Sequence, residues 1–184
     1  DITDTQRVYV RADARDMEGF NRTMGVADFV MPALGTATPI LDTTTRTIVD
    51  ASACTACHGD PLERASHGGG YQSPQVCNMC HSPIGIYGDG MQASGFWLAS
   101  LIHGIHSATL VGTWPDEDPV DFTEVTYPKN IIDCGACHFD AGQGMADAWM
   151  NNPTQEVCTT CHIDTTFTVD PPATHTGGSQ ANNN

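Results

Sequence analysis

The amino-acid sequence predicts a mostly irregular fold with short α-helices and little β-structure. Two observations favour this fold class. All eight cysteines fall into four C-x-x-C-H motifs, and 184 residues leave only 46 residues for each motif, so there is little chain with which to build a separate hydrophobic centre. Proline follows a helix N-cap residue ahead of several motifs, and this pattern starts short helices.

Each motif places two cysteines three residues apart and a histidine directly after the second cysteine. In a c-type haem site the two thiols bond to the haem vinyl groups and the histidine becomes the proximal iron ligand. Zinc ribbons do not require a histidine after every pair, and disulfide frameworks seldom space all cysteines identically. The sequence therefore predicts four covalently bound c-type haems. The attachment residues are Cys54, Cys57, Cys77, Cys80, Cys134, Cys137, Cys158 and Cys161, and the proximal histidines are His58, His81, His138 and His162.

Four histidines lie outside the motifs: His67, His103, His106 and His175. Four irons need four second axial ligands, so the economical interpretation is bis-histidine ligation at every haem. His103 and His106 stand at positions i and i+3 of the segment LIHGIH, and on a helix they point the same way. Methionine is the alternative axial ligand, but the seven methionines are scattered and Met79 lies inside a motif. For any one of these histidines the alternative is a surface or packed side chain.

The elements are expected in the following order. Residues 1–50 lack cysteine and histidine, and the β-prone runs RVYV and TRTIV predict an extended N-terminal arm or a small strand pair. Residues 51–184 form the predicted tetrahaem-binding domain. Short helices are expected to begin at Asp60-Pro61, Ser73-Pro74 and Asn152-Pro153, and the last two run into the second and fourth motifs. The longest helix is predicted over residues 94–108 and carries LIHGIH on a broad apolar face.

The formal net charge of −15, from 22 acidic and 7 basic residues, disfavours nucleic acid and anionic membranes as partners. There is no run of 18 apolar residues, so no membrane span is expected. Six of the seven basic residues precede residue 65. This asymmetry is compatible with head-to-tail contact between copies of the chain, but a solvated surface is the favoured interpretation.

The residues CHGDPLERASHGGG and CNMCHSP resemble the opening of a pentahaem domain in the outer-membrane decahaem cytochromes, the OmcA/MtrC family. LIHGIH, VTYPKNIIDCGACH and THTGGSQANNN resemble later segments of that domain in the same order. The resemblance implies that His67, His103, His106 and His175 are distal ligands. No fifth motif follows, so in design the chain is similar to the tetrahaem cytochromes that polymerise into extracellular filaments, such as OmcE of Geobacter. A histidine of one filament subunit can ligate a haem of the next, and His175 is the candidate here.

Bis-histidine ligation leaves no open iron position, which suits outer-sphere electron transfer. The sequence therefore predicts extracellular electron transfer by the repeating subunit of a head-to-tail homopolymer, and not an enzyme. Its other partners are expected to be redox proteins or extracellular acceptors. Haem attachment takes place outside the cytoplasm, so an extracellular or cell-surface location is expected, with the periplasm as the alternative. The competing functions are a soluble periplasmic tetrahaem shuttle and a multihaem reductase, which needs a five-coordinate haem.

Overall fold

The computed structural model describes residues 4–12, 23–40, 47–59, 62, 73–82, 97–113, 119–142 and 145–162. The chain divides into two compact units. The first contains Asp1–Cys80 and Cys134–Asn151, and the second contains His81–Asp133 and Asn152–Asn184. The division passes through the second C-x-x-C-H motif, between Cys80 and His81.

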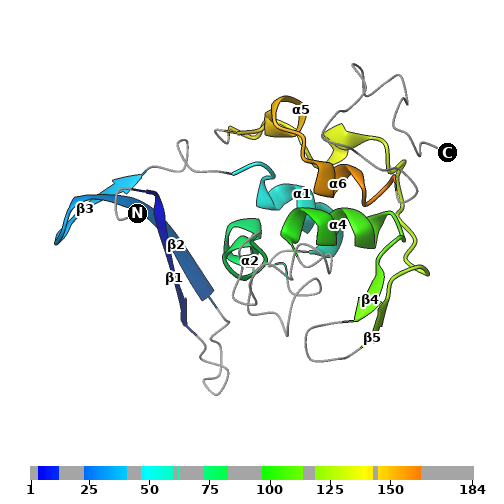
Figure 1. Ribbon diagram of the computed structural model, residues 1–184, viewed down its shortest axis with the longest axis horizontal. Coiled ribbons are helices and arrows are strands. Elements are labelled where there is room, and N and C mark those ends of the chain that lie inside the picture. The colour runs from blue at the N-terminus through cyan, green and yellow to red at the C-terminus, as the bar shows by residue number, and fades with distance from the viewer. Residues whose placement is uncertain are drawn as a thin grey trace. The chain divides into compact units, whose positions relative to one another are not determined.

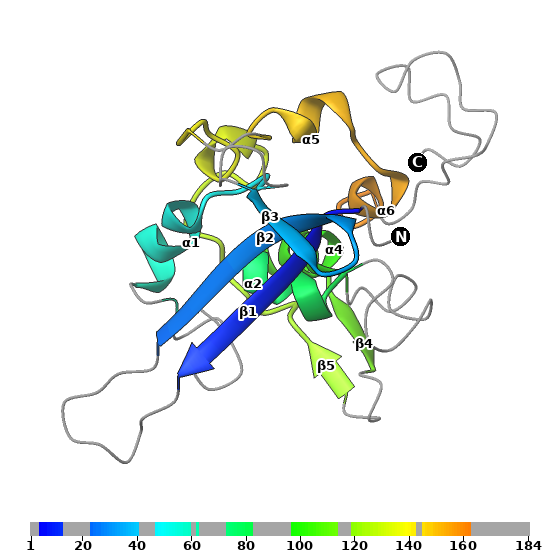
Figure 2. The ribbon, with the colours of Figure 1, turned by 90° about the vertical axis from the view of Figure 1, so that its left-hand side faces the viewer.

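The first unit contains a three-stranded antiparallel sheet in the order β1-β2-β3 (Figure 1). Its strands are β1 (Gln6–Ala12), β2 (Thr23–Ala33) and β3 (Thr36–Ile40). Figure 2 shows β1 and β2 side by side. Their register runs from Gln6 opposite Phe29 to Ala12 opposite Thr23. Leu34 and Gly35 form a two-residue turn from β2 to β3, in which Gly35 takes a φ of 85° that a side chain would disfavour.

The sheet has one strand more than the predicted strand pair. The segment TATPI of β3 is short and contains a proline, which argues against a strand in sequence, and it pairs with β2. The run TRTIV was the other β-prone signal. Its described part, residues 47–49, forms no strand.

The helices of the first unit are α1 (Ala51–His58), α2 (Pro74–Cys80), the 3₁₀ turn η3 (Cys134–Ala136) and α5 (Ala148–Asn151). Asp50 is the N-cap of α1, and its carboxylate accepts hydrogen bonds from the Ser52 N–H at 2.8 Å and the Ser52 hydroxyl at 2.6 Å. α2 begins at Pro74, as the Ser73-Pro74 pair predicted, and Val76 on it is 2% exposed. The Asp60-Pro61 signal lies outside the described residues.

The second unit contains α4 (Leu98–His106), the strands β4 (Val111–Thr113) and β5 (Pro119–Asp121), and α6 (Gln155–Cys158). β4 and β5 form a two-stranded antiparallel sheet, and α4 contacts α6. α4 is shorter than predicted. It starts after Trp97, which offers no side-chain cap, and ends before Ala108, whose φ of 57° leaves the helical region.

The expected helix start at Asn152-Pro153 is wrong. α5 ends at Asn151, and α6 begins at Gln155 after Thr154, whose carbonyl accepts from the Cys158 N–H at 3.1 Å. In the described part of the chain, the buried apolar side chains are Leu62, Val76, Leu101 and Ala148. No helix in the described ranges has the length and apolar character to cross a bilayer.

Candidate haem-attachment sites

Each C-x-x-C-H motif forms a helical turn in the structure. The first lies within α1, and the two cysteines of the second lie on α2. In the other two motifs the N–H groups of the second cysteine and of the histidine both bond to the carbonyl of the first cysteine. These distances are 3.2 and 2.9 Å to Cys134, and 3.3 and 3.0 Å to Cys158. Residues three apart on such a turn lie on one side of the backbone, as attachment of two thiols to one haem requires.

None of the eight cysteines forms a disulfide. One side chain of each pair is exposed and the other is partly buried. The partly buried member comes first in three motifs and second in the motif of Cys134 and Cys137. The chain therefore holds four pairs of thiols at the spacing that haem attachment uses.

Three of the attachment turns belong to the first unit, and their thiols interact. Burial raises the pKa of the Cys54 thiol to about 11, and repulsion from Cys137, Cys77 and Asp50 adds to this effect. Burial also raises the pKa of Cys77. Cys54 is thus near thiols of two other motifs.

The two histidines of α4 are held by their own helix. His103 Nδ1 lies 2.7 Å from the Ala99 carbonyl oxygen, and His106 Nδ1 lies 2.8 Å from the Ile102 carbonyl oxygen. Because a carbonyl can only accept, each Nδ1 carries the proton in these bonds, which makes Nε2 the nitrogen with the lone pair. This is the tautomer and ring fixation that a metal-ligating histidine needs.

Two of the candidate ligand imidazoles, those of His106 and His138, contact aromatic side chains. The ring centroids of His106 and Tyr127 are 5.5 Å apart, and the rings meet edge to face at 81°. Those of His138 and Trp149 are 5.6 Å apart at an interplanar angle of 32°. The sequence did not mark Tyr127 or Trp149 as partners, because neither shares a helix with the histidine that it contacts.

Helix α4 is joined at both ends to haem motifs of the second unit. At its start the Leu98 N–H bonds to the carbonyl of His81, the histidine of the second motif, at 2.8 Å. After its end, Thr109 Oγ1 donates to the carbonyl of Thr160 in the fourth motif at 2.7 Å. The second unit therefore groups the two candidate distal ligands with His81 and His162, two of the predicted proximal ligands.

His67 and His175 lie outside the described residues, so the structure places only two of the four predicted distal ligands. Among the residues it does describe, no three His, Cys, Asp or Glu side chains form a cluster that could hold a bare metal ion. A haem needs fewer protein ligands than a bare metal ion, because the porphyrin itself binds the iron. The chain has to supply two thiols and two axial ligands. The paired thiols and the tautomers of His103 and His106 fit that requirement.

Residues 46–184 match the model of a family described as outer membrane cytochrome MtrC/MtrF-like, domains II/IV. No curated protein and no solved structure matches the chain. The matched range contains all four C-x-x-C-H motifs and all eight histidines. The three-stranded sheet of β1, β2 and β3 lies outside it.

Proposed function

The chain belongs to the family of MtrC/MtrF-like outer membrane cytochromes, domains II/IV, and on that basis we propose that it carries electrons along four bis-histidine c-type haems. The family supports electron transfer by a multihaem cytochrome. The proposed number of haems rests on four turns inside the matched range, each of which has a cysteine pair and a following histidine.

The residues divide between attachment and ligation. The eight cysteines attach the haems through thioether bonds, and His58, His81, His138 and His162 are the proximal ligands. His67, His103, His106 and His175 are the distal ligands. A bound haem supplies one-electron exchange at its iron. The backbone carbonyls that hold Nδ1 of His103 and His106 fix the two rings in advance, so that Nε2 can ligate without a change of tautomer.

We assign this activity to an electron-transfer protein and not to an enzyme. Two histidines close both axial positions of an iron, which leaves no place for a substrate to bind. A formal charge of −15 also repels the anionic substrates that multihaem reductases take. Carbon monoxide binding to the reduced protein tests this point, because avid binding at one haem would favour the reductase.

The proposed setting is the cell surface or the extracellular space, as the repeating subunit of a cytochrome filament. The location rests on the outer-membrane description of the family. The filament rests on the uneven charge, with six basic and ten acidic residues up to residue 64 but one basic and twelve acidic residues after it. In such a filament His175 is the candidate to ligate a haem of the neighbouring subunit.

Two measurements test the proposal in order. Intact mass of the native protein is expected to show four covalent haems, and its absorption spectrum is expected to be low-spin in both oxidation states. Electron microscopy of the haem-stained extracellular fraction is then expected to show uniform filaments. Discrete small particles would contradict the filament and favour a periplasmic shuttle or a conduit docked to a partner, whereas a lower haem count would contradict the ligation scheme itself.

A further inference from the structure

The first unit contains an ion pair that the haem motifs do not explain. Arg7 of β1 and Asp28 of β2 face each other in the strand register. The guanidinium contacts both carboxylate oxygens, with Nε to Oδ1 and Nη2 to Oδ2 both at 2.6 Å. The side chain of Asp28 is 2% exposed and that of Arg7 is 18% exposed. Two parallel charge-assisted bonds in a buried setting fix the guanidinium in one orientation.

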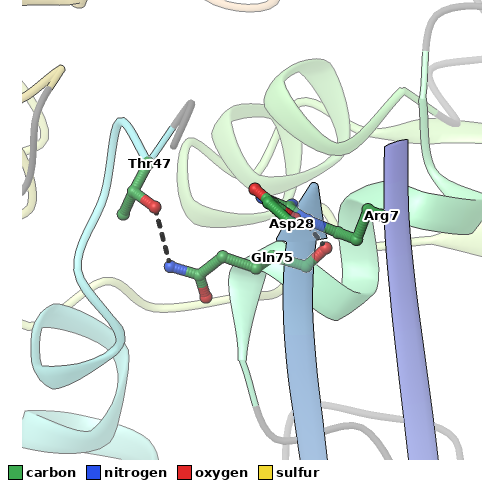
Figure 3. Close-up of polar contacts among 4 residues, drawn as sticks. All are labelled: Arg7, Asp28, Thr47 and Gln75. Carbon is green, nitrogen blue, oxygen red and sulfur yellow. Dashed lines mark hydrogen bonds and ion pairs between the residues drawn. The ribbon is translucent and has the colours of Figure 1, made fainter. Parts of the chain in front are cut away.

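The third donor of Arg7 reaches the helix that carries the second haem motif. Arg7 Nη1 donates to the carbonyl of Gln75 at 3.1 Å, and Gln75 is the second residue of α2, two positions before Cys77. The side-chain amide of Gln75 donates to Thr47 Oγ1 at 3.2 Å. Figure 3 shows the amide pointing to Thr47, with Arg7 and Asp28 on the other side of Gln75. A continuous polar chain thus joins the sheet, α2 and the segment that precedes α1.

Electrostatics explains why the arginine has an acidic partner. A cation beside the first turn of a helix is disfavoured by the helix dipole, and a buried guanidinium is costly when it is unpaired. Asp28 offsets both costs, so the pair is close to neutral where it meets α2. If one partner is removed, a full charge remains in a poorly solvated place near Cys77.

The sheet stands outside the residues that match the cytochrome family, so this contact is additional to the matched haem-binding segment. We infer that Arg7 and Asp28 are a positioning pair for the second haem. Arg7 holds the first turn of α2, and Asp28 keeps the local charge near zero, so that together they set the placement and the potential of the haem attached to Cys77 and Cys80. The inference rests on the proposed haem-binding function.

The charge effect gives the decisive test. The Debye length is about 10 Å at ~0.1 M salt, and partly buried charges are screened less than exposed ones. Asp28→Asn removes the carboxylate that pairs with the Arg7 guanidinium, so it leaves an uncompensated positive charge near α2. This charge favours the reduced haem. The midpoint potential of the haem attached to Cys77 and Cys80 is therefore expected to rise more than the other three potentials.

The experiment is a spectroscopic redox titration of the full haem-loaded chain. The potential of the second haem is assigned as the one that changes in His81→Met. The double variant Arg7→Gln with Asp28→Asn removes both charges and is expected to return that potential to the wild-type value. Arg11→Gln is the matched control, since Arg11 is exposed on the same strand, and it is expected to leave all four potentials in place.

A second, conservative variant keeps the inference testable if the Asp28→Asn protein folds poorly. Arg7→Lys keeps the charge but cannot reproduce the paired contacts of a guanidinium. It is expected to shift the low-spin electron paramagnetic resonance signal of one haem while all four potentials hold. Four covalent haems with unshifted potentials in Asp28→Asn and an unshifted signal in Arg7→Lys would overturn the positioning pair alone. An intact mass that lacks four haems would instead overturn the proposed function.

Discussion

Thr109 and Thr160 are joined by a hydrogen bond of 2.7 Å from the Thr109 hydroxyl to the Thr160 carbonyl, although 51 residues separate them. Thr160 lies between the two cysteines of the fourth motif. Thr109 follows α4, and its N–H bonds back to the Gly104 carbonyl at 3.0 Å. One side chain therefore links the helix of the candidate distal histidines to an attachment turn.

Thr109→Val is expected to destabilise the second unit, because valine keeps the shape of threonine but leaves the partly buried Thr160 carbonyl without this donor. The expected cost is about 1 kcal/mol, or a fall in Tm of about 2–4 °C for a chain of this length. Thermal unfolding followed by circular dichroism measures it. Thr126→Val at an exposed position is the control, and equal Tm values for the two variants would contradict the prediction.

Gly104→Val is expected to lower the free energy of unfolding by more than Thr109→Val does. Gly104 is buried on α4 between His103 and His106, and a Cβ added there would lie 3.1 Å from Leu110 Cβ. Crowding of this kind costs about 1–3 kcal/mol. Gly112→Val is the matched control, because a Cβ at Gly112 meets no atom within 4 Å. Denaturant unfolding compares the two variants, and a Gly112→Val protein that is the less stable of the two would speak against this packing.

His103→Ala and His106→Ala are each expected to convert one haem from low-spin to high-spin. Each variant should lose about one quarter of the low-spin electron paramagnetic resonance signal and gain one carbon monoxide site in the reduced state, and the double variant should show twice the effect. Ile102→Ala on the same helix, at a side chain that is 43% exposed, is the control. A single variant with a fully low-spin spectrum would remove that histidine from the set of ligands.

Asp50 gives a prediction with a pH dependence. Hydrogen bonds from the Ser52 hydroxyl and then from the Ser52 N–H lower the pKa of Asp50 in the folded chain. The stabilisation is therefore present above the ordinary pKa of aspartate and is lost as the pH falls through the lowered folded pKa. Asp50→Ala is expected to cost about 1 kcal/mol at neutral pH through loss of the α1 cap.

The control for that variant is Asp50→Asn, which keeps an N-cap acceptor but cannot titrate. Unfolding curves collected from neutral to acidic pH should show the stability difference between the wild type and Asp50→Ala shrinking with acid. For Asp50→Asn, stability should be close to that of the wild type at neutral pH and show less dependence on pH. An Asp50→Ala difference that stays constant down to strongly acidic pH would exclude the cap as its source.

The sequence was sufficient where a short-range rule decides the structure. Ser73-Pro74 identified the start of α2, and the spacing of His103 and His106 fits their place on one helix. The four C-x-x-C-H motifs each form a helical turn, and haem attachment there stays a prediction. It was insufficient where partners come from distant segments. The strand β3 exists through pairing with β2, and the contact of Arg7 with Gln75 joins residues 68 positions apart. Asn152-Pro153 shows the limit of the local rule, because α6 begins at Gln155 and not at Pro153.

The carbonyl bonds of His103 and His106 also bear on how fast electrons can move. A side chain that is already immobilised on its own helix loses little further conformational entropy when it binds iron. It also has few alternative orientations to adopt when the charge on the iron changes. With both rings held at Nδ1, at 2.7 and 2.8 Å, the surroundings of the two irons in the proposed ligation scheme would need little rearrangement at each electron transfer.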